Sequence, residues 1–257
     1  IYITRKRRII WRTYLDMEKS IIELDDYINL TDLDIVNKEF LDSIDKVPVE
    51  CISEFHAYQH ALNTPDNIGR GSGVTRNVIV LTHYANKNKR IRFGKELSLD
   101  DYSFIDKSKY WSDSPEYDNY FPKLKKLILG LPFDSIGRNV MVFNKGLSKG
   151  IIHYDVCGKL CKCRVGGKGG VKRNWENWRQ EFIWLRLNKN KKLFVGMDEK
   201  YTFLKGNSCW FNTRFPYYHG AESSMKYTAS VRIDGKFTRE FREKLFGEGS
   251  TWETIKI

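Results

Sequence analysis

Three side chains that could bind a metal occur at two separate places in the chain. His153 and Asp155 stand two residues apart, so on an extended strand both side chains leave the same face. His219 follows 66 positions after His153, and Arg232 comes 13 positions after His219. Two imidazoles and one carboxylate on one side of a metal suit a non-haem ferrous ion and leave its remaining positions open. Arg232 would then offer a cationic fork to a carboxylate beside that metal.

At these residues the chain resembles the Fe(II)/2-oxoglutarate-dependent dioxygenase superfamily, and its layout is most similar to the aspartyl/asparaginyl β-hydroxylase-like branch. The similarity covers roughly residues 137–235. It consists of an arginine-led strand (Arg138–Phe143), a glycine-containing turn, the His-x-Asp strand, and a second glycine turn with its strand (Lys205–Asn212) before the distal histidine. Where that family tends to carry a Pro-Gly turn, this chain has Lys145-Gly146.

The resemblance implies a metal, two co-substrates and the residues that hold them. Fe(II) would be bound by His153, Asp155 and His219, with 2-oxoglutarate and O2 as co-substrates. The carboxylate of 2-oxoglutarate that is remote from the metal would bind Arg232. The other residues expected around this co-substrate are Ser230, Trp184 and Asn212.

The substrate-binding residues are expected from their positions beside this centre. Arg138, Tyr154 and Arg179 are expected to line the substrate pocket. The family often carries an Arg-x-His element on the strand after the His-x-Asp loop, and Trp184 stands here in the histidine-like place. Either Arg179 or Arg186 could substitute for that element, and the sequence does not distinguish between them.

The activity that the resemblance implies is hydroxylation of an unactivated C–H bond in a small molecule or an amino-acid side chain, free or in a peptide. Succinate and CO2 would be the co-products. Asp155 favours hydroxylation, because family members that halogenate usually lack this carboxylate. Desaturation and cyclisation stay open. Two further alternatives are the same chemistry on a nucleic acid, and a non-enzymatic, cupin-like basic binding domain with structural histidines.

Short strands are the elements that would position these residues. Strand-like runs separated by turn residues occur at Glu181–Leu187, Lys192–Met197, Tyr201–Leu204, Ser208–Thr213 and Tyr227–Asp234. Such a succession is typical of a sandwich or barrel. We therefore expect an α+β, mainly β fold with a double-stranded β-helix core of the jelly-roll or cupin-like type.

The last of these runs has a clear alternation. One face would carry Thr228, Ser230, Arg232 and Asp234, and the other face Tyr227, Ala229, Val231 and Ile233. Arg232 thus has polar neighbours and an apolar reverse face, as expected for a strand that lines a polar cavity.

Helices are expected outside this core, within one catalytic domain that spans residues 1–257. Residues 11–62 carry apolar side chains at mixed three- and four-residue spacings, which predicts a mainly helical N-terminal region, 1–72. The core would span 74–235, with a helix at Pro122–Leu131, and a closing helix and tail would occupy 236–257. The polar, aromatic-rich residues 102–120 are interpreted as a long loop, either a lid or a packed surface loop.

Two other groups of side chains have metal-binding types. His56 and His60 would share a face of a helix, which suits a zinc pair, although no HExxH signature is present. A solvent-facing or substrate-facing helix surface is the alternative. Cys157, Cys161 and Cys163 lie within seven residues, and either a zinc site or reduced thiols in a loop would explain them.

Composition limits the class of protein. The net charge of +12 favours anionic partners, including small anionic substrates, an acidic protein or a nucleic acid. Five cysteines without a framework pattern predict a reduced, cytoplasmic protein. No run of about 18 apolar residues is present, and the basic cluster Arg5–Arg8 has no apolar stretch or cleavage site of a signal peptide. The chain starts with Ile1 instead of Met, which suggests a trimmed N-terminus. The oligomeric state cannot be inferred.

Overall fold

The computed structural model describes residues 21–57, 74–84, 111–145, 181–197, 200–212, 217–222 and 224–248. Strands dominate these ranges, and every pairing between them is antiparallel. The strands are β1 (Ile21–Glu23), β2 (Ser53–Ala57), β3 (Val74–Val80), β4 (Thr82–Tyr84), β5 (Trp111–Asp113), β6 (Phe133–Asn144), β7 (Phe182–Arg186), β8 (Leu193–Met197), β9 (Lys200–Phe203), β10 (Ser208–Phe211), β11 (Tyr218–Ala221) and β12 (Thr228–Phe237).

Two sheets form the body of the described protein. The large sheet has seven strands in the order β1-β10-β7-β12-β6-β3-β2, and the small sheet has three in the order β11-β8-β9. β4 and β5 form a separate two-stranded ladder. From β7 onward the chain alternates between the sheets: β7 is in the large sheet, β8 and β9 in the small one, β10 in the large one, β11 in the small one, and β12 in the large one.

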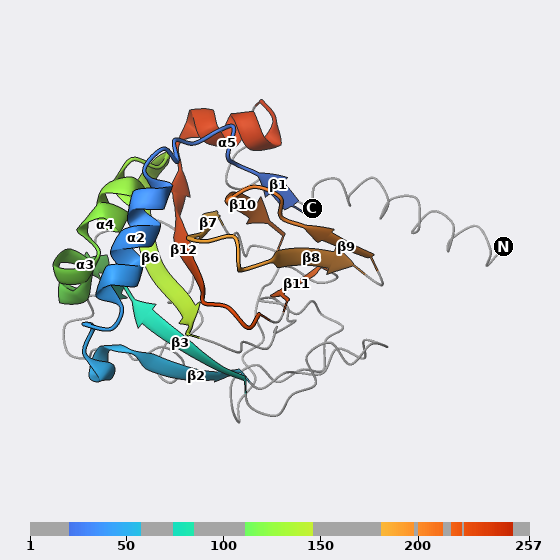
Figure 1. The fold of residues 1–257 in the computed structure, drawn as a ribbon. Coiled ribbons are helices and arrows are strands. Elements are labelled where there is room, and N and C mark those ends of the chain that lie inside the picture. The colour runs from blue at the N-terminus through green and yellow to red at the C-terminus, as the bar shows by residue number, and fades with distance from the viewer. Residues whose placement is uncertain are drawn as a thin grey trace, which may run out of the picture.

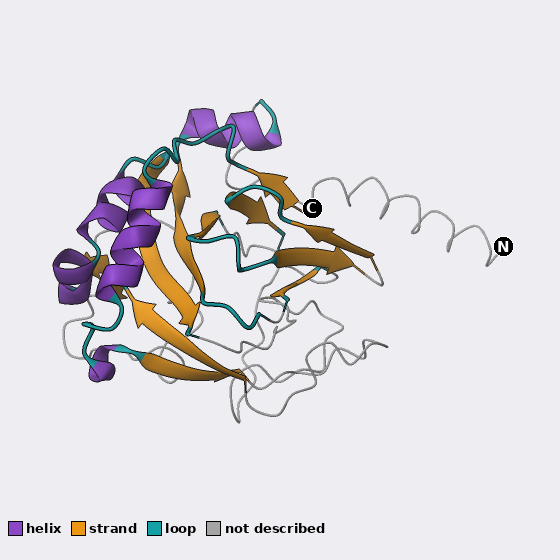
Figure 2. Cartoon of the chain, viewed as in Figure 1, coloured by secondary structure: helices purple, strands orange, loops and turns teal. Residues whose placement is uncertain are grey.

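Helices cover the side of the large sheet that is turned away from the small sheet (Figure 1). The described helices are α2 (Leu33–Ser43), α3 (Pro115–Tyr120), α4 (Pro122–Leu129) and α5 (Arg239–Phe246), with a 3-10 turn, η2, at Val49–Cys51, and α2, α3 and α4 are the ones on this side. Figure 2 shows α2, α3 and α4 together on one side and α5 over the end of the sheet. The order of layers is therefore helices, large sheet, small sheet.

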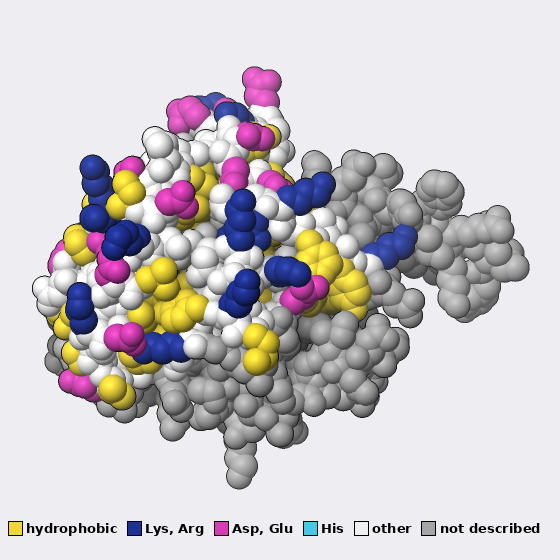
Figure 3. Space-filling view, in the orientation of Figure 1, with side chains coloured by type: hydrophobic (Ala, Val, Ile, Leu, Met, Phe, Trp, Pro, Cys, Tyr) yellow, Lys and Arg dark blue, Asp and Glu magenta, His cyan; other side chains and the backbone are white. Residues whose placement is uncertain are grey.

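The surface of the described ranges is mixed in charge. These ranges contain 20 Lys and Arg and 20 Asp and Glu, so the excess of +12 is carried by residues outside them. On the face seen in Figure 3, basic and acidic side chains are interspersed with apolar ones. Within the same ranges, no helix is both long and apolar enough to cross a membrane.

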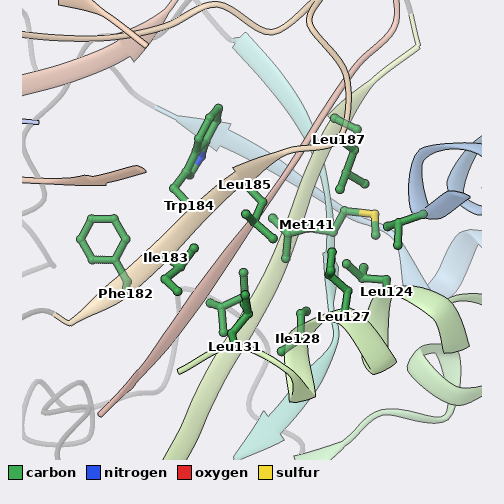
Figure 4. Packing of buried hydrophobic residues seen from close by; sticks show 14 of the residues in the cluster. Leu124, Leu127, Ile128, Leu131, Met141, Phe182, Ile183, Trp184, Leu185 and Leu187 are labelled. Atoms are coloured by element: carbon green, nitrogen blue, oxygen red, sulfur yellow. The ribbon is translucent and has the colours of Figure 1, made fainter. Parts of the chain in front are cut away.

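The main hydrophobic core lies between the helices and the large sheet. Alternation along β7 sends Ile183 and Leu185 toward this core and Phe182 and Trp184 to the opposite face (Figure 4). The core contains Leu124, Leu127 and Ile128 of α4, which recur at helical spacing on one buried face. Phe40 of α2 packs edge-on against Phe143 of β6, with 5.9 Å between ring centroids. Burial of this apolar surface attaches the helices to the sheet.

Most of the expected elements after residue 120 are confirmed. The five predicted strand runs correspond to β7, β8, β9, β10 and β12, with ends that differ by at most three residues. The predicted helices correspond to α4 and α5. The mainly β, antiparallel character of the fold with a few helices is confirmed as well.

The helical interpretation of residues 11–62 is wrong for much of its described part. Only α2 is an α-helix there, and Ile21–Glu23 and Ser53–Ala57 are strands at the two opposite edges of the large sheet. His56 therefore lies in β2, and the shared helix face with His60 is lost. The reason is that edge pairing with β10 and β3 outweighs local helix preference.

The described part of the expected loop at 102–120 is also ordered differently. Trp111–Asp113 forms β5, and Pro115–Tyr120 forms α3. Ser114 caps α3, because its hydroxyl accepts a hydrogen bond from the backbone N–H of Tyr117 at 3.2 Å. Pro115 at the first helical position completes a favourable helix start.

Candidate functional site

The polar face predicted for β12 is turned toward the small sheet, and we call it the inner face. In the register of the large sheet, Arg232 lies opposite Trp184 of β7 and Val140 of β6. Cys209 of β10 lies opposite Trp184, and directly opposed residues share one face. The inner face therefore carries alternate residues of β6, β7, β10 and β12, while their neighbours enter the core beneath the helices.

His219 lies between the two sheets. It is in β11, opposite Val195 of β8, and only 6% of its surface is exposed. Its ring packs on Phe211 of the large sheet, with 4.7 Å between centroids. Phe211 in turn packs edge-on against Phe182, with 4.9 Å between centroids. The distal histidine expected from the sequence thus faces the inner face of the large sheet.

Arg232 is held at the same place by two contacts. The centre of its guanidinium lies 4.1 Å from the centroid of the Phe182 ring. Its Nε donates a hydrogen bond to Oδ1 of Asp234 at 2.9 Å. Two phenyl rings therefore connect His219 to Arg232, and the two residues predicted for the metal and the co-substrate meet on one inner surface.

Asp234 is the most buried charged group of this region, with 1% exposure. Its second oxygen, Oδ2, accepts hydrogen bonds from Nε and Nη2 of Arg138, each at 2.8 Å. Arg138, expected to contact the substrate, is thus paired with Asp234 on β12. Because a buried carboxylate needs charged partners, the two arginines stabilise Asp234 and Asp234 orients both of them.

Of the other residues expected around the co-substrate, Trp184 and Ser230 are buried on the inner face, and Asn212 is buried beyond the end of β10. Trp184, 7% exposed, lies directly opposite Arg232. Ser230, 2% exposed, precedes Arg232 by one same-face position and accepts a hydrogen bond from Nζ of Lys191 at 2.8 Å. Asn212 is buried immediately after the end of β10.

Four residues of the predicted site fall outside the described ranges: His153, Tyr154, Asp155 and Arg179. The cysteines Cys157, Cys161 and Cys163 and His60 lie outside them as well. In the part of the chain that the structure describes, no cluster of three or more His, Cys, Asp or Glu side chains could hold a metal ion. All three iron ligands expected from the sequence, His219 included, stay predictions.

Three residues of this surface were not singled out from the sequence as functional. Phe182 and Phe211 link His219 to Arg232, and Asp234 orients Arg232. For Asp234 a signal existed, because it shares the predicted face of β12 two positions beyond Arg232. The two phenylalanines gave no signal apart from their place in short strands.

Comparisons with known proteins give structural similarities alone. No protein-family model matches the chain, and no curated protein matches it. Among solved structures, the chain is similar to a prolyl hydroxylase from Trichoplax adhaerens in complex with a peptide fragment of the hypoxia inducible factor oxygen degradation domain. The identity is 10%, the alignment covers 97% of this chain and 96% of that chain, and the TM-score is 0.44.

A second similar structure is an oxidoreductase of the 2OG-Fe(II) oxygenase family from Burkholderia pseudomallei. Its identity is 10%, its alignment covers 81% of this chain and 91% of that chain, and its TM-score is 0.35. Both TM-scores lie below 0.5, and the function proposed below rests on the residues of this chain.

Proposed function

We propose that the protein is an Fe(II)- and 2-oxoglutarate-dependent oxygenase whose centre lies between the small sheet and the inner face of the large sheet. The observation that carries this proposal is the convergence of His219 and Arg232 through Phe211 and Phe182. A buried imidazole and a fixed guanidinium, joined through two phenyl rings, suit a metal whose co-substrate ends in a second carboxylate.

The alternation of strands between the two sheets supports a double-stranded β-helix as the scaffold. Strands β7 to β12 wind back and forth between two facing sheets, as the strands of a jelly roll do. In such an arrangement, ligands from distant parts of the sequence reach one interior. His153 and Asp155, on the predicted strand between β6 and β7, would complete the ligand set with His219.

Arg232 is prepared to bind a carboxylate in one orientation. Asp234 contacts Nε of Arg232 and Phe182 contacts the flat face of its guanidinium, so both contacts fix the direction in which the guanidinium lies. The edge of a guanidinium forms paired, charge-assisted hydrogen bonds to a carboxylate. Trp184 and Asn212 would line the co-substrate.

The chemistry would come from the bound iron with 2-oxoglutarate and O2, which together decarboxylate the co-substrate and hydroxylate a C–H bond of the substrate. The protein's own contribution is to orient the co-substrate through Arg232 and to keep water away. The buried rings of Phe182, Phe211 and Trp184 would exclude water from the centre. As substrate we propose a small molecule or an amino-acid side chain, free or in a peptide.

Anaerobic loading with Fe(II) and 2-oxoglutarate tests the proposal. A metal-to-ligand charge-transfer band should appear with the wild-type protein, and succinate should form when O2 is admitted with a substrate. His219→Phe keeps an aromatic ring against Phe211 but removes the metal-binding nitrogens, so the band should disappear while the folded protein persists. His153→Ala should also abolish the band.

Arg232→Gln distinguishes the binding of the co-substrate from the binding of the metal. It should raise the concentration of 2-oxoglutarate needed for half of the band by at least tenfold and leave iron binding within about threefold. Arg239→Gln is the matched control, because Arg239 is a 78% exposed arginine on α5 and should change neither. A full band in both histidine variants would show that the iron site lies elsewhere, and no band in the wild-type protein would show that there is none.

A further inference from the structure

A second group of donors lies on the inner face, beyond Arg232 along β12. Ser230 is directly opposite Arg186 of β7, so the two side chains stand next to each other on one face. Nζ of Lys191, in the turn between β7 and β8, donates to Oγ of Ser230 at 2.8 Å. Nη1 of Arg186 donates to the carbonyl of Lys191 at 3.4 Å. Lys191 therefore contacts both residues: its ammonium binds Ser230, and its backbone carbonyl accepts from Arg186.

Two buried donors in this group lack an acceptor among the described residues. Ser230 is 2% exposed, and its oxygen accepts the bond from Lys191, which leaves its own O–H proton to be donated. Arg186 is 5% exposed, and its Nε has no hydrogen-bond partner within the described ranges. Buried donors without acceptors are costly, and an anion with several oxygens would satisfy both.

The buried charge of Arg186 also favours a bound anion. Its guanidinium donates to two backbone carbonyls, of Lys191 and of Lys205, and burial lowers its pKa. The nearby carboxylates of Asp25 and Glu23 are hydrogen-bonded instead to the turn before β10. Glu23 accepts from the backbone N–H groups of residues 205 and 206, and Asp25 from those of residues 207 and 208. Among the described residues, neither carboxylate hydrogen-bonds to the Arg186 guanidinium.

This group is separate from the proposed co-substrate anchor. Ser230 and Arg232 are successive same-face positions of β12, so their backbones lie about 7 Å apart. The guanidinium of Arg232 extends toward Phe182 and Asp234, and Asp234 lies on the far side of Arg232 from Ser230. A single carboxylate held at the edge of Arg232 would not reach the Ser230 hydroxyl.

We propose that Arg186, Lys191 and Ser230 form a second oxyanion-binding site on the inner face, which takes a compact oxyanion such as phosphate or a carboxylate. Ser230 then belongs to this site and not to the 2-oxoglutarate anchor expected from the sequence. The site requires neither iron nor 2-oxoglutarate, so its existence can be tested independently of the proposed oxygenase activity.

Calorimetric titration of the metal-free protein with inorganic phosphate, at constant ionic strength, tests the site. Lys191→Met removes the ammonium but keeps the stem and the carbonyl that Arg186 uses, and it should raise the phosphate Kd at least tenfold. Ser230→Ala should raise it at least threefold. Lys192→Met is the matched control: this neighbouring lysine is 65% exposed and pairs with Glu222, so the Kd should change less than twofold.

A parallel titration with acetate distinguishes a free inorganic ion from a carboxylate as the preferred ligand, and dependence on Lys191 in either series supports the site. The weakening caused by Lys191→Met should persist when Arg232 is also replaced by Gln. Equal affinities for Lys191→Met and Lys192→Met, or a loss confined to Arg232→Gln, would overturn the proposal. Thermal unfolding of each variant without added anion checks that the fold is retained.

Discussion

Asp234 and Arg232, two residues apart on β12, form an ion pair on the inner face, with 2.9 Å between Oδ1 and Nε. The other carboxylate oxygen accepts from Nε and Nη2 of Arg138 at 2.8 Å. One buried carboxylate therefore fixes guanidiniums from two adjacent strands, β12 and β6. Its removal affects both stability and the orientation of the proposed co-substrate anchor.

We expect Asp234→Asn to lower the free energy of unfolding by about 3 kcal/mol, because two largely buried guanidiniums lose their common counter-charge. Urea unfolding measures this change. Asp134→Asn provides the control, since that carboxylate is 47% exposed and 3.9 Å from Lys236, and its loss should change stability by no more than about 0.5 kcal/mol. Equal losses in the two variants would show that the buried ion pairs of Asp234 with Arg138 and Arg232 stabilise the protein no more than an exposed pair does.

A second buried ion pair joins the closing helix to the large sheet. Nε and Nη2 of Arg242 donate to the two oxygens of Glu181 at 2.5 and 3.0 Å, and these hydrogen bonds raise the pKa of Arg242. The backbone N–H of Phe237 also donates to Glu181 at 2.7 Å. Glu181 thus connects the start of β7, the end of β12 and α5.

We expect Glu181→Gln to destabilise the protein by about 3–5 kcal/mol, since it leaves Arg242 buried without a counter-charge. Amide hydrogen exchange should show faster exchange in α5 than in the middle of β12. Glu243→Gln breaks the pair with the 78% exposed Arg239 and should change the free energy of unfolding by less than about 1 kcal/mol. Unchanged protection of α5 in Glu181→Gln would contradict this role.

Gly196 permits the close packing of the small sheet that carries His219. A Cβ at this position would lie 2.7 Å from the ring of Tyr218 and 2.8 Å from the carbonyl oxygen of Lys200. Gly196→Ala should therefore cost about 1–3 kcal/mol and, by displacing β11, weaken the iron-dependent charge-transfer band. Gly130→Ala is the control, because the nearest atom to its added Cβ is 3.4 Å away at the end of α4, and it should leave both the band and the melting temperature nearly unchanged.

Cys209 should be chemically inert in the folded protein. It is fully buried, and burial raises the pKa of its thiol well above the usual value. At pH 8, iodoacetamide should modify this residue only after unfolding, as peptide mass spectrometry can follow. Rapid modification under native conditions would show that β10 opens readily.

The raised pKa of Cys209 also sets the sign of a pH dependence. The unfolded chain gives up the thiol proton first, so the contribution of this residue to stability is complete below about pH 8.5 and is lost as the pH rises further. Cys209→Ala should therefore flatten the decline of the unfolding free energy between pH 8 and pH 10. An unchanged slope would assign the decline to other groups.

Local patterns were sufficient where one face of an element is buried. The alternation in β12 predicted that Ser230, Arg232 and Asp234 share a face opposite Val231 and Ile233, and the register with β6 and β7 confirms it. The spacing of apolar residues likewise predicted α4 and α5. In these segments the period of the buried side chains follows directly from the backbone geometry.

By itself, the sequence determined the strands and helices of the second half and the His and Arg residues whose chemistry suits a metal and a carboxylate. Only the tertiary structure decided that Ile21–Glu23 and Ser53–Ala57 pair as edge strands, that Arg138 reaches Asp234 across 96 positions, and that Phe211 and Phe182 join His219 to Arg232. The physical reason is range. Periodicity depends on neighbouring residues, whereas edge pairing and buried ion pairs depend on partners that folding alone brings together.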